Sequence, residues 1–148
     1  ATATLVAGCG VDMLPKPTGG PLPFLFTGGS QQTPDWVTQN GDGWMPPRDA
    51  AAQCRVVSDY RRSIAESGGQ NKPVMQSLYV DHLEDPNAPS RPIHLSFQSG
   101  VNFLQTYLHE VQFLGMHHVA LNLRFNQAAI PATLTRLSAE LMPNFSAK

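Results

Sequence analysis

Residues 23–45 read PFLFTGGSQQTPDWVTQNGDGWM, and this stretch decides the fold. The apolar run from Phe24 to Phe26 predicts a short buried strand, which is ended by the glycine-rich turn after it. Thr33 is a typical helix N-cap and Pro34 a typical first helical residue, while Asn40 and the glycine after it predict the end of that helix. The sequence therefore predicts a strand, a glycine-rich turn and a helix in succession.

The turn between this strand and this helix has the chemistry of an anion site. The free N–H groups at the beginning of a helix and the positive end of its dipole favour a phosphate. Gly28 and Gly29 allow a ligand's oxygens to approach the backbone, and the hydroxyls of Ser30 and Thr33 add donors. An ordinary connection between a strand and a helix uses the same residue types, and this alternative stays open at this point.

Strand and helix patterns alternate through the rest of the chain. We expect a very short strand over 43–45, a helix over 49–66, a strand over 74–80, a polar surface loop over 81–92, a helix over 101–114 with Gly115 at its C′ position, a strand over 118–123, and a last helix opened by Pro131 and ended by Pro143. Apolar positions at helical spacing predict the buried faces of two of these helices: Ala50, Cys54, Val57, Tyr60 and Ile64 in one, and Ile130, Leu134, Leu137 and Leu141 in the other.

The order of these elements predicts the fold class. Alternating strands and helices indicate an α/β fold with parallel strands and right-handed crossovers. About four such units form the C-terminal half of a TIM (β/α)8 barrel, which typically needs about 250 residues. We therefore expect an extended lead-in over residues 1–22 and a single half-barrel domain over residues 23–148, part of a larger barrel. Its outer strands would expose their edges and inward side chains such as Val119 and Leu121, and such edges recruit further strands.

The composition argues against several classes of protein. The 148 residues carry a net charge of −1, which gives no electrostatic basis for binding nucleic acid or an anionic membrane. No apolar run approaches the roughly 20 residues of a membrane span. The chain has 2 cysteines, too few for a disulfide framework, so we expect a cytoplasmic protein. The absence of an initiator methionine favours a trimmed piece of a longer protein.

In an α/β barrel, the active face lies at the C-terminal ends of the strands. That rule selects the turn from Gly28 to Thr33 and the residues Arg48, Tyr79, Asp81, His82, Asn122, Arg124 and Asn126. A guanidinium binds phosphate or carboxylate through paired hydrogen bonds, so Arg48 and Arg124 are candidates for a pocket wall. The alternative for both is a salt bridge to Asp42, Asp49 or Asp81. Asp81 and His82 are either an acid–base pair or the start of a solvated loop.

The histidines do not predict a metal site. His109 lacks the second histidine that a zincin helix requires, because Phe113 stands in its place. His117 and His118 are neighbours on a predicted strand and would point to opposite faces. We therefore expect no bound metal.

The motifs follow one another in an order that resembles the second half of the bacterial luciferase-like, flavin-dependent monooxygenases. In that family a strand ends in a turn rich in Gly, Ser and Thr, followed by an acidic–Trp pair and a short strand with Asp-Gly; here these are residues 27–33, 35–36 and 41–44. One branch adds Pro-Lys-Pro, Pro-Arg, Met-Gln-Ser-Leu-Tyr, Ile-His-Leu and Ala-Leu-Asn-Leu-Arg-Phe segments, which match residues 15–17, 47–48, 75–79, 93–95 and 120–125. The resemblance covers nearly the whole chain from about Asp12.

This resemblance implies an oxidoreductase that uses reduced FMN, or a related flavin or deazaflavin, together with oxygen and a small-molecule substrate. It implies that the turn beginning at Gly28 holds the flavin phosphate through the side chains of Ser30 and Thr33 and the backbone N–H groups of Gly29 and Gln31. The family often carries a different residue where Gly29 stands. The implied pocket residues are Arg48, Tyr79, Asn122 and Arg124, and no catalytic residue is assigned.

The full barrel of that family has four more strands before the matching segment. We therefore expect the parent protein to be an enzyme and the 148-residue chain alone not to be a competent one. The expected partners are a complementing N-terminal half-barrel or a second copy of the chain, and a flavin reductase. The alternatives are a module that binds a phosphorylated ligand without redox chemistry and a non-catalytic fragment that a partner chain completes.

Overall fold

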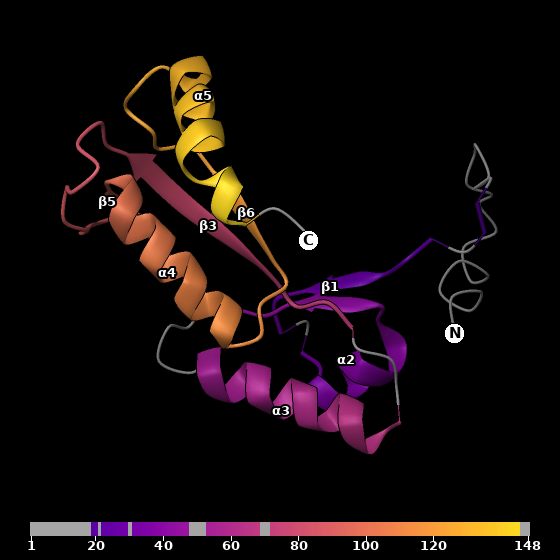
Figure 1. Ribbon diagram of the computed structural model, residues 1–148. Coiled ribbons are helices and arrows are strands. Elements are labelled where there is room, and N and C mark those ends of the chain that lie inside the picture. Colours follow the sequence, from indigo (N-terminus) through magenta and orange to yellow (C-terminus); the bar gives the residue numbers. More distant parts are fainter. Residues whose placement is uncertain (1–18, 21, 30, 48–52, 69–71, 146–148) are drawn as a thin grey trace. The chain divides into compact units, whose positions relative to one another are not determined.

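The computed structural model describes residues 19–20, 22–29, 31–47, 53–68 and 72–145. Figure 1 shows the elements, which run from strand β1 to the 3-10 helix η1. The chain divides into two compact units, residues 1–73 and residues 74–148. Both combine helices with strands that pair mainly in parallel, so the fold belongs to the α/β class predicted from the sequence.

Among the described residues, the first unit contains two parallel strands and two helices. They are β1 (Leu25–Thr27), α2 (Pro34–Asn40), β2 (Gly43–Met45) and α3 (Gln53–Glu66). The buried apolar residues are Val37, Trp44, Val57, Tyr60 and Ile64, and the rings of Trp44 and Tyr60 pack with their centroids 5.1 Å apart. The buried face predicted for α3 is thus confirmed at Val57, Tyr60 and Ile64, while Ala50 and the side chain of Cys54 lie outside the described residues.

The sequence Gly41-Asp42-Gly43 brings β2 close against β1. Asp42 Oδ2 accepts the N–H of Phe24 at 2.7 Å, and the Asp42 N–H donates to the Phe24 carbonyl at 2.7 Å. A Cβ on Gly41 would lie 2.6 Å from the ring of Phe26, and one on Gly43 would lie 2.4 Å from the side chain of Leu25. These glycines are therefore needed because β1 approaches closely, a common reason for glycine in a strand.

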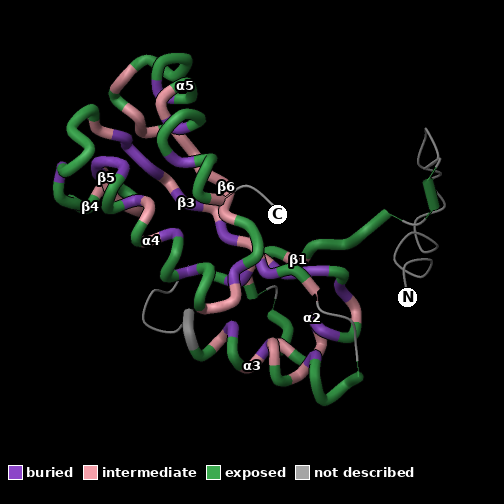
Figure 2. Tube along the Cα trace, in the orientation of Figure 1, coloured by how far each residue is buried: buried purple, intermediate pink, exposed green. Residues whose placement is uncertain are grey.

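The second unit is built on a sheet with strand order β4-β5-β3-β6. Its strands are β3 (Met75–His82), β4 (Arg91–Ile93), β5 (Ser96–Ser99) and β6 (His118–Asn122), and its helices are α4 (Val101–Phe113), α5 (Ile130–Glu140) and η1 (Met142–Asn144). The central strand β3 pairs in parallel with β6 over 75–79 and with β5 over 80–82, and β4 is antiparallel to β5. Figure 2 shows how buried residues recur along β3.

The two faces of the β3–β6 pair differ. Gln76 and Leu78 of β3 are buried, and the Gln76 amide donates to the Tyr107 hydroxyl of α4 at 2.9 Å. Their register partners, Val119 and Leu121, line a cavity of about 290 Å³ together with residues of α4. Val119 and Leu121 therefore face the helices, and the prediction that they point to the inner side of a barrel is wrong. The other face carries Tyr79 and its neighbours, because side chains alternate along a strand.

Residues 81–92 do not form the simple surface loop that was predicted. Asp81 and His82 continue β3, and Arg91–Ile93 forms an edge strand paired with β5. The two-residue turn between β4 and β5 places Leu95 at a positive φ of 66° without the help of a glycine. Strands this short have no readable periodicity, and the pairing that creates them joins residues far apart in the sequence. Pro92 is tolerated because β4 is an edge strand.

The apolar face predicted for α5 is confirmed at Leu137 and Leu141 but not at Ile130 and Leu134, and the strand β1 is more exposed than predicted. In α5, Ile130 is 41% and Leu134 54% exposed, while Thr133 is buried with Leu137 and Leu141. The helix is turned toward Thr133 because its hydroxyl accepts the side-chain amide of Asn126 at 2.9 Å. In β1, Leu25 is 47% exposed, so this strand is not the buried one that its composition predicts.

Candidate functional site

The turn between β1 and α2 is fixed by residues of β2. Gly28 has a φ of +64°, a conformation that glycine adopts without strain. Its N–H donates to the Met45 carbonyl at 2.8 Å, and its carbonyl accepts the indole N–H of Trp44 at 2.9 Å. The buried Trp44 thus ties the beginning of the turn to the core of the first unit.

The middle of the turn presents backbone N–H groups at the surface. Gln31 has a φ of +55°, which is uncommon for a residue with a side chain. The N–H of Gln32 donates to the Gly29 carbonyl at 2.8 Å and closes the turn. Gly29 and Gln31 are exposed, and no acceptor among the described residues takes the N–H of either one. Ser30 lies outside the described residues.

Thr33 is the N-cap of α2, as predicted. Its Oγ1 accepts the N–H of Trp36 at 3.2 Å, and Pro34 follows in the first turn of the helix. A hydroxyl has one proton to donate as well as lone pairs to accept, so Thr33 retains a donor for a ligand. The sequence therefore located this cap and the residues around it correctly.

Acidic side chains restrict the direction from which an anion can reach Thr33. A hollow of about 400 Å³ between α2 and α3 is lined by Thr33 and by the carboxylates of Asp35, Asp59 and Glu66, with Arg62 as the basic residue. Arg62 is already paired with Asp59 at 2.5 Å. Like charges repel, so an anion would approach from the side of Gly29 and Gln31.

Predicted pocket residues gather at the C-terminal end of the ladder between β3 and β6. Tyr79 and Asn122 are register partners on the face opposite to α4. Arg124 follows β6, and its N–H donates to Asn122 Oδ1 at 3.0 Å. The Arg124 guanidinium lies 5.7 Å from the centre of the Phe125 ring, which packs 5.3 Å from the ring of Tyr79. The second unit thus brings Tyr79, Asn122 and Arg124 together, while Arg48 lies outside the described residues.

Two aromatic residues of this cluster were not predicted. Phe125 contacts Tyr79, and His94, at the tip of the β4–β5 turn, meets the Phe125 ring edge-on at 5.5 Å. Phe125 was identifiable in principle, since it lies beside Arg124 just after a predicted strand. His94 had no such signal because the hairpin that carries it was unrecognised. Among the described residues, no carboxylate lies within ion-pair distance of Arg124.

Asp81 and His82 do not form an acid–base pair. They are consecutive residues of β3, so their side chains point to opposite faces. Asp81 Oδ1 accepts the N–H of Gln127 at 2.9 Å, and only 4% of Asp81 is exposed. His82 is 2% exposed, and burial lowers its pKa, with Arg136 lowering it further and Glu140 opposing the shift.

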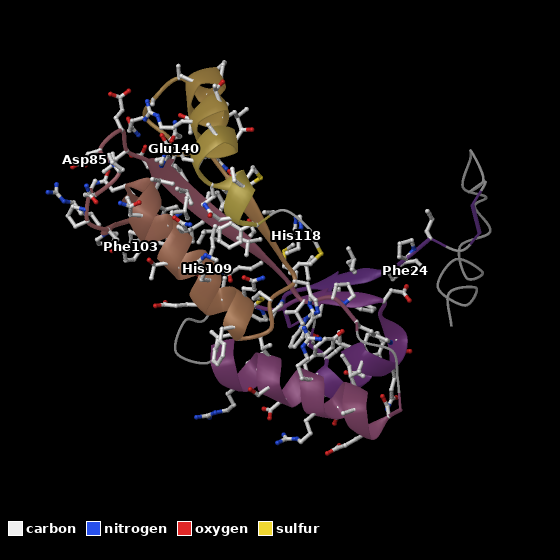
Figure 3. The ribbon with its side chains drawn as sticks, viewed as in Figure 1. Phe24, Asp85, Phe103, His109, His118 and Glu140 are labelled. Carbon is white, nitrogen blue, oxygen red and sulfur yellow. The ribbon has the colours of Figure 1, made fainter. Side chains whose placement is uncertain are left out.

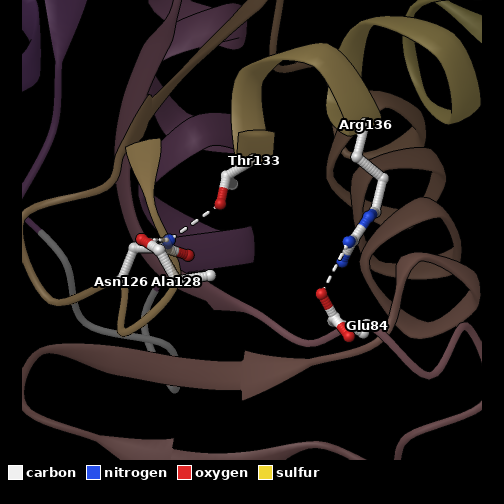
Figure 4. A network of polar contacts seen from close by, with 5 residues as sticks. All are labelled: Glu84, Asn126, Ala128, Thr133 and Arg136. Atoms are coloured by element: carbon white, nitrogen blue, oxygen red, sulfur yellow. Dashed lines mark hydrogen bonds and ion pairs between the residues drawn. The ribbon is translucent and has the colours of Figure 1, made fainter. Parts of the chain in front are cut away.

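The loop from Leu123 to Ala129 is held to the end of β3 by Asn126. Its Oδ1 accepts the backbone N–H of His82 at 2.9 Å. Its Nδ2 donates to the Ala128 carbonyl at 2.8 Å and to Thr133 Oγ1 at 2.9 Å (Figure 4). Asn126 was among the residues selected at the strand ends, but nothing in the sequence indicated these partners.

The described histidines do not gather around a metal. His109 of α4 packs on Phe145 with ring centroids 4.6 Å apart, and His117 Nδ1 accepts the N–H of Val74 at 3.1 Å. His118 lies on β6 (Figure 3). Within the described part of the chain, no group of His, Cys, Asp and Glu side chains is arranged to hold a metal ion. None of the helices found there is long and apolar enough to cross a membrane.

Comparison with known proteins adds no assignment. No protein-family model matches the chain, and no curated protein matches it. The two candidate regions are therefore the turn from Gly28 to Thr33 in the first unit and the cluster around Tyr79 and Arg124 in the second.

Proposed function

We propose that the chain is part of a flavin-dependent, luciferase-like monooxygenase and contributes the C-terminal half of its TIM barrel. In this proposal the flavin phosphate binds at the turn after β1, and the cofactor is FMN or a related flavin or deazaflavin. The observation that carries the proposal is the pair of exposed N–H groups at Gly29 and Gln31, directly after a parallel strand. Backbone donors at such a turn are suited to a phosphate.

In this proposal, the residues of the turn have different roles in binding the phosphate. The N–H groups of Gly29 and Gln31 donate to its oxygens, and the hydroxyls of Ser30 and Thr33 add donors from the side chains. Gly28 does not donate, because its N–H is taken by Met45 at 2.8 Å. Its part is to set the direction of the turn, together with the indole of Trp44.

The proposed pocket residues of the second unit are Tyr79, Asn122 and Arg124. A bound reduced flavin supplies the reaction with oxygen, while the protein orients the ring and excludes water. Tyr79 and Asn122 occupy the face of β3 and β6 opposite to α4, which in this proposal is the inside of the barrel. Arg124 provides a guanidinium that no described carboxylate neutralises. Arg48, which lies outside the described residues, remains a proposed pocket residue from the sequence alone.

The proposed partner completes the sheet. Among the described strands, β6 pairs only with β3 and β1 only with β2, so each has an edge without a neighbour. An N-terminal half-barrel or a second copy of the chain would cover these edges. Light scattering on the 148-residue chain should therefore find a species larger than about 16 kDa, the mass of one copy. A monodisperse monomer with a cooperative melt would contradict this assembly.

A phosphate-binding module without redox chemistry is the second candidate. It is favoured by the fact that every proposed phosphate contact lies in the turn, so that binding requires nothing from the second unit. Such a module would bind phosphorylated compounds whether or not they carry a flavin ring. It would leave Tyr79 and Arg124 without a ligand.

Titration with FMN and with riboflavin, which lacks the phosphate, tests the proposal. We expect FMN to bind at least tenfold more tightly, since a hydrogen bond to a charged group contributes about 1.5–3 kcal/mol. The double variant Ser30→Ala/Thr33→Ala should lose most of this preference, whereas Thr33→Ser, which keeps a hydroxyl, should retain it. Equal affinity for the two flavins would remove the phosphate assignment. Tight binding of inorganic phosphate without a preference for FMN would favour the second candidate.

A further inference from the structure

The imidazole of His82 is buried without a partner. Only 2% of the residue is exposed, and neither ring nitrogen has a hydrogen-bond partner among the described residues. Its register partner on β5 is Ser99, whose hydroxyl is also buried and unpaired. The Ser99 carbonyl lies near the ring and acts to raise the pKa of His82, and it also accepts the N–H of Leu83 at 2.9 Å. A neutral imidazole tolerates such a place far better than a charged one.

The charged groups around this ring come from α5 and from β3. Arg136 and Glu140 of α5 act on it with opposite signs, and Asp81 of β3 adds a smaller attraction. Arg136 also pairs with Glu84 at 3.0 Å (Figure 4). The neighbouring residues 96–106 contain no ionisable side chain. Desolvation is the largest influence and lowers the pKa of His82.

The backbone of the same residue holds the loop that carries the proposed pocket wall. The His82 N–H donates to Asn126 Oδ1 at 2.9 Å, and the adjacent Asp81 carboxylate accepts the N–H of Gln127 at 2.9 Å. Arg124 and Phe125 lie just before these anchored residues. Movement of the end of β3 would therefore release both anchors at once.

We propose that His82 is a positioning residue that holds the loop 123–129 only while its imidazole is neutral, so that acid frees Arg124 and Phe125 from the end of β3. A proton on this ring would place a second cation near Arg136 in a buried site. The ring can then remain charged only by moving into water, and its own backbone N–H leaves Asn126 as it moves. The role of this loop as a pocket wall rests on the proposed function, but the release of the loop in acid does not.

The direction of the pH dependence follows from the pKa values of the two states. A histidine exposed to water has a pKa of about 6.5. The buried imidazole has a lowered pKa, so the released state binds more protons whenever the pH is below about 6.5. The anchored loop is therefore fully favoured above that pH and is lost progressively as the pH falls toward the lower value. Within that range, the equilibrium constant between the anchored and the released loop falls about tenfold for each pH unit.

Amide hydrogen exchange on the 148-residue chain between pH 8 and pH 5 tests this proposal. After correction for intrinsic rates, the protection of the His82 and Gln127 amides, which make the two anchoring hydrogen bonds, should fall about tenfold as the pH falls from 8 to 5, whereas that of Val57 and Tyr60 in the first unit should not. His82→Gln should remove the pH dependence, and His118→Gln, which changes an exposed ring, should leave it intact. If His82→Gln does not fold, the ring signals of His82 in the wild type supply the same test.

Two results would overturn the proposal. One is constant protection of the loop across this pH range in the wild type, and the other is the same acid-induced loss in His82→Gln. Neither depends on a flavin, so a failed FMN titration would leave the loop measurement intact. Conversely, a loop insensitive to pH would not bear on the phosphate turn.

Discussion

The loops after β1 and after β6 both connect a parallel strand to a helix, but different contacts hold them in place. Each leads from the end of a parallel strand to a helix with proline in its first turn, Pro34 in one case and Pro131 in the other. The first loop ends in a side-chain cap, Thr33, and leaves backbone N–H groups at the surface. The second ends at Ala129 without a side-chain cap and is held instead by Asn126. The two loops therefore differ in whether their polar groups remain at the surface or form hydrogen bonds within the protein.

This difference separates two kinds of candidate site. A loop whose anchors lie outside it, such as Trp44, can offer its own backbone to a ligand. In a loop whose polar side chains hold the loop itself, only the remaining side chains can contact a ligand, and here these are Arg124 and Phe125. The first arrangement is suited to an anion, and the second to a ligand that is recognised by side chains.

Removing the internal anchor should have the largest effect on stability. Asn126→Ala deletes the bonds to His82, Ala128 and Thr133 and leaves buried groups unpaired. We expect a loss of about 2–4 kcal/mol, because each unpaired buried group costs roughly 1–3 kcal/mol. Urea unfolding measures it, with Asn87→Ala, which removes an exposed side-chain contact, as the control. A loss no greater than that of the control would mean that Asn126 does not anchor the loop.

Removing the external anchor should cost less. Trp44→Phe retains an aromatic ring on Tyr60 but loses the hydrogen bond to the Gly28 carbonyl. We expect a loss of about 1–3 kcal/mol from the hydrogen bond and the reduced volume. Trp36→Phe is the matched control, because the Trp36 indole N–H makes no hydrogen bond within the described residues. Thermal melts giving the same loss for both variants would contradict the role assigned to Trp44.

The cap of the first loop should contribute about 1 kcal/mol. Thr33→Ala removes the acceptor for the Trp36 N–H, and loss of an N-cap typically costs 0.5–2 kcal/mol. Thr33→Ser keeps the oxygen and should be close to wild type in urea unfolding. If serine is as harmful as alanine, the hydroxyl is not what stabilises the beginning of α2.

The ion pair beside the second loop should contribute least. The side chain of Glu84 is 82% exposed, and its pairing with Arg136 is screened by water. Glu84→Gln should therefore change the free energy of unfolding by about 0.5 kcal/mol or less. Comparison at low and high salt should show little further change. A loss approaching that of Asn126→Ala would reverse the ranking of the two contacts in Figure 4.

Local signals accounted for much of the first loop and little of the second. Thr33 and Pro34 act within the first turn of the helix that follows them, so their positions alone predict the cap. Gly115 likewise ends α4 with a φ of +94°, as its position predicted. The hydrogen-bond partners of Asn126 range from His82 to Thr133, and a pattern within one segment cannot predict contacts between residues so far apart in the sequence.

Part of the buried face of α5, the faces of β6 and the hairpin were missed for related reasons. Thr133 is buried where Leu134 was expected, because a hydrogen bond to Asn126 outweighs apolar spacing at the exposed end of α5. Val119 and Leu121 were assigned to the wrong face because alternation reveals two faces without showing which one meets the helices. The β4–β5 hairpin depends on its pairing with the end of β3. The end of β3 was placed two residues too early for the same reason, so Tyr79 lies within the strand and not after it.

The staggered pairing of β3 has a mechanical consequence. The strand is bonded to β6 over 75–79 and to β5 over 80–82, so no residue of β3 is in a ladder with both neighbours. A force pulling β6 away would load the first ladder directly and the second only through the connections between the two. Within β3, the two ladders meet at the peptide bond between Tyr79 and Val80, and the bonds from Asn126 and Gln127 to the end of β3 are a second connection between them. The aromatic cluster on Tyr79 thus lies at one of the two junctions through which strain applied to one half of the sheet reaches the other.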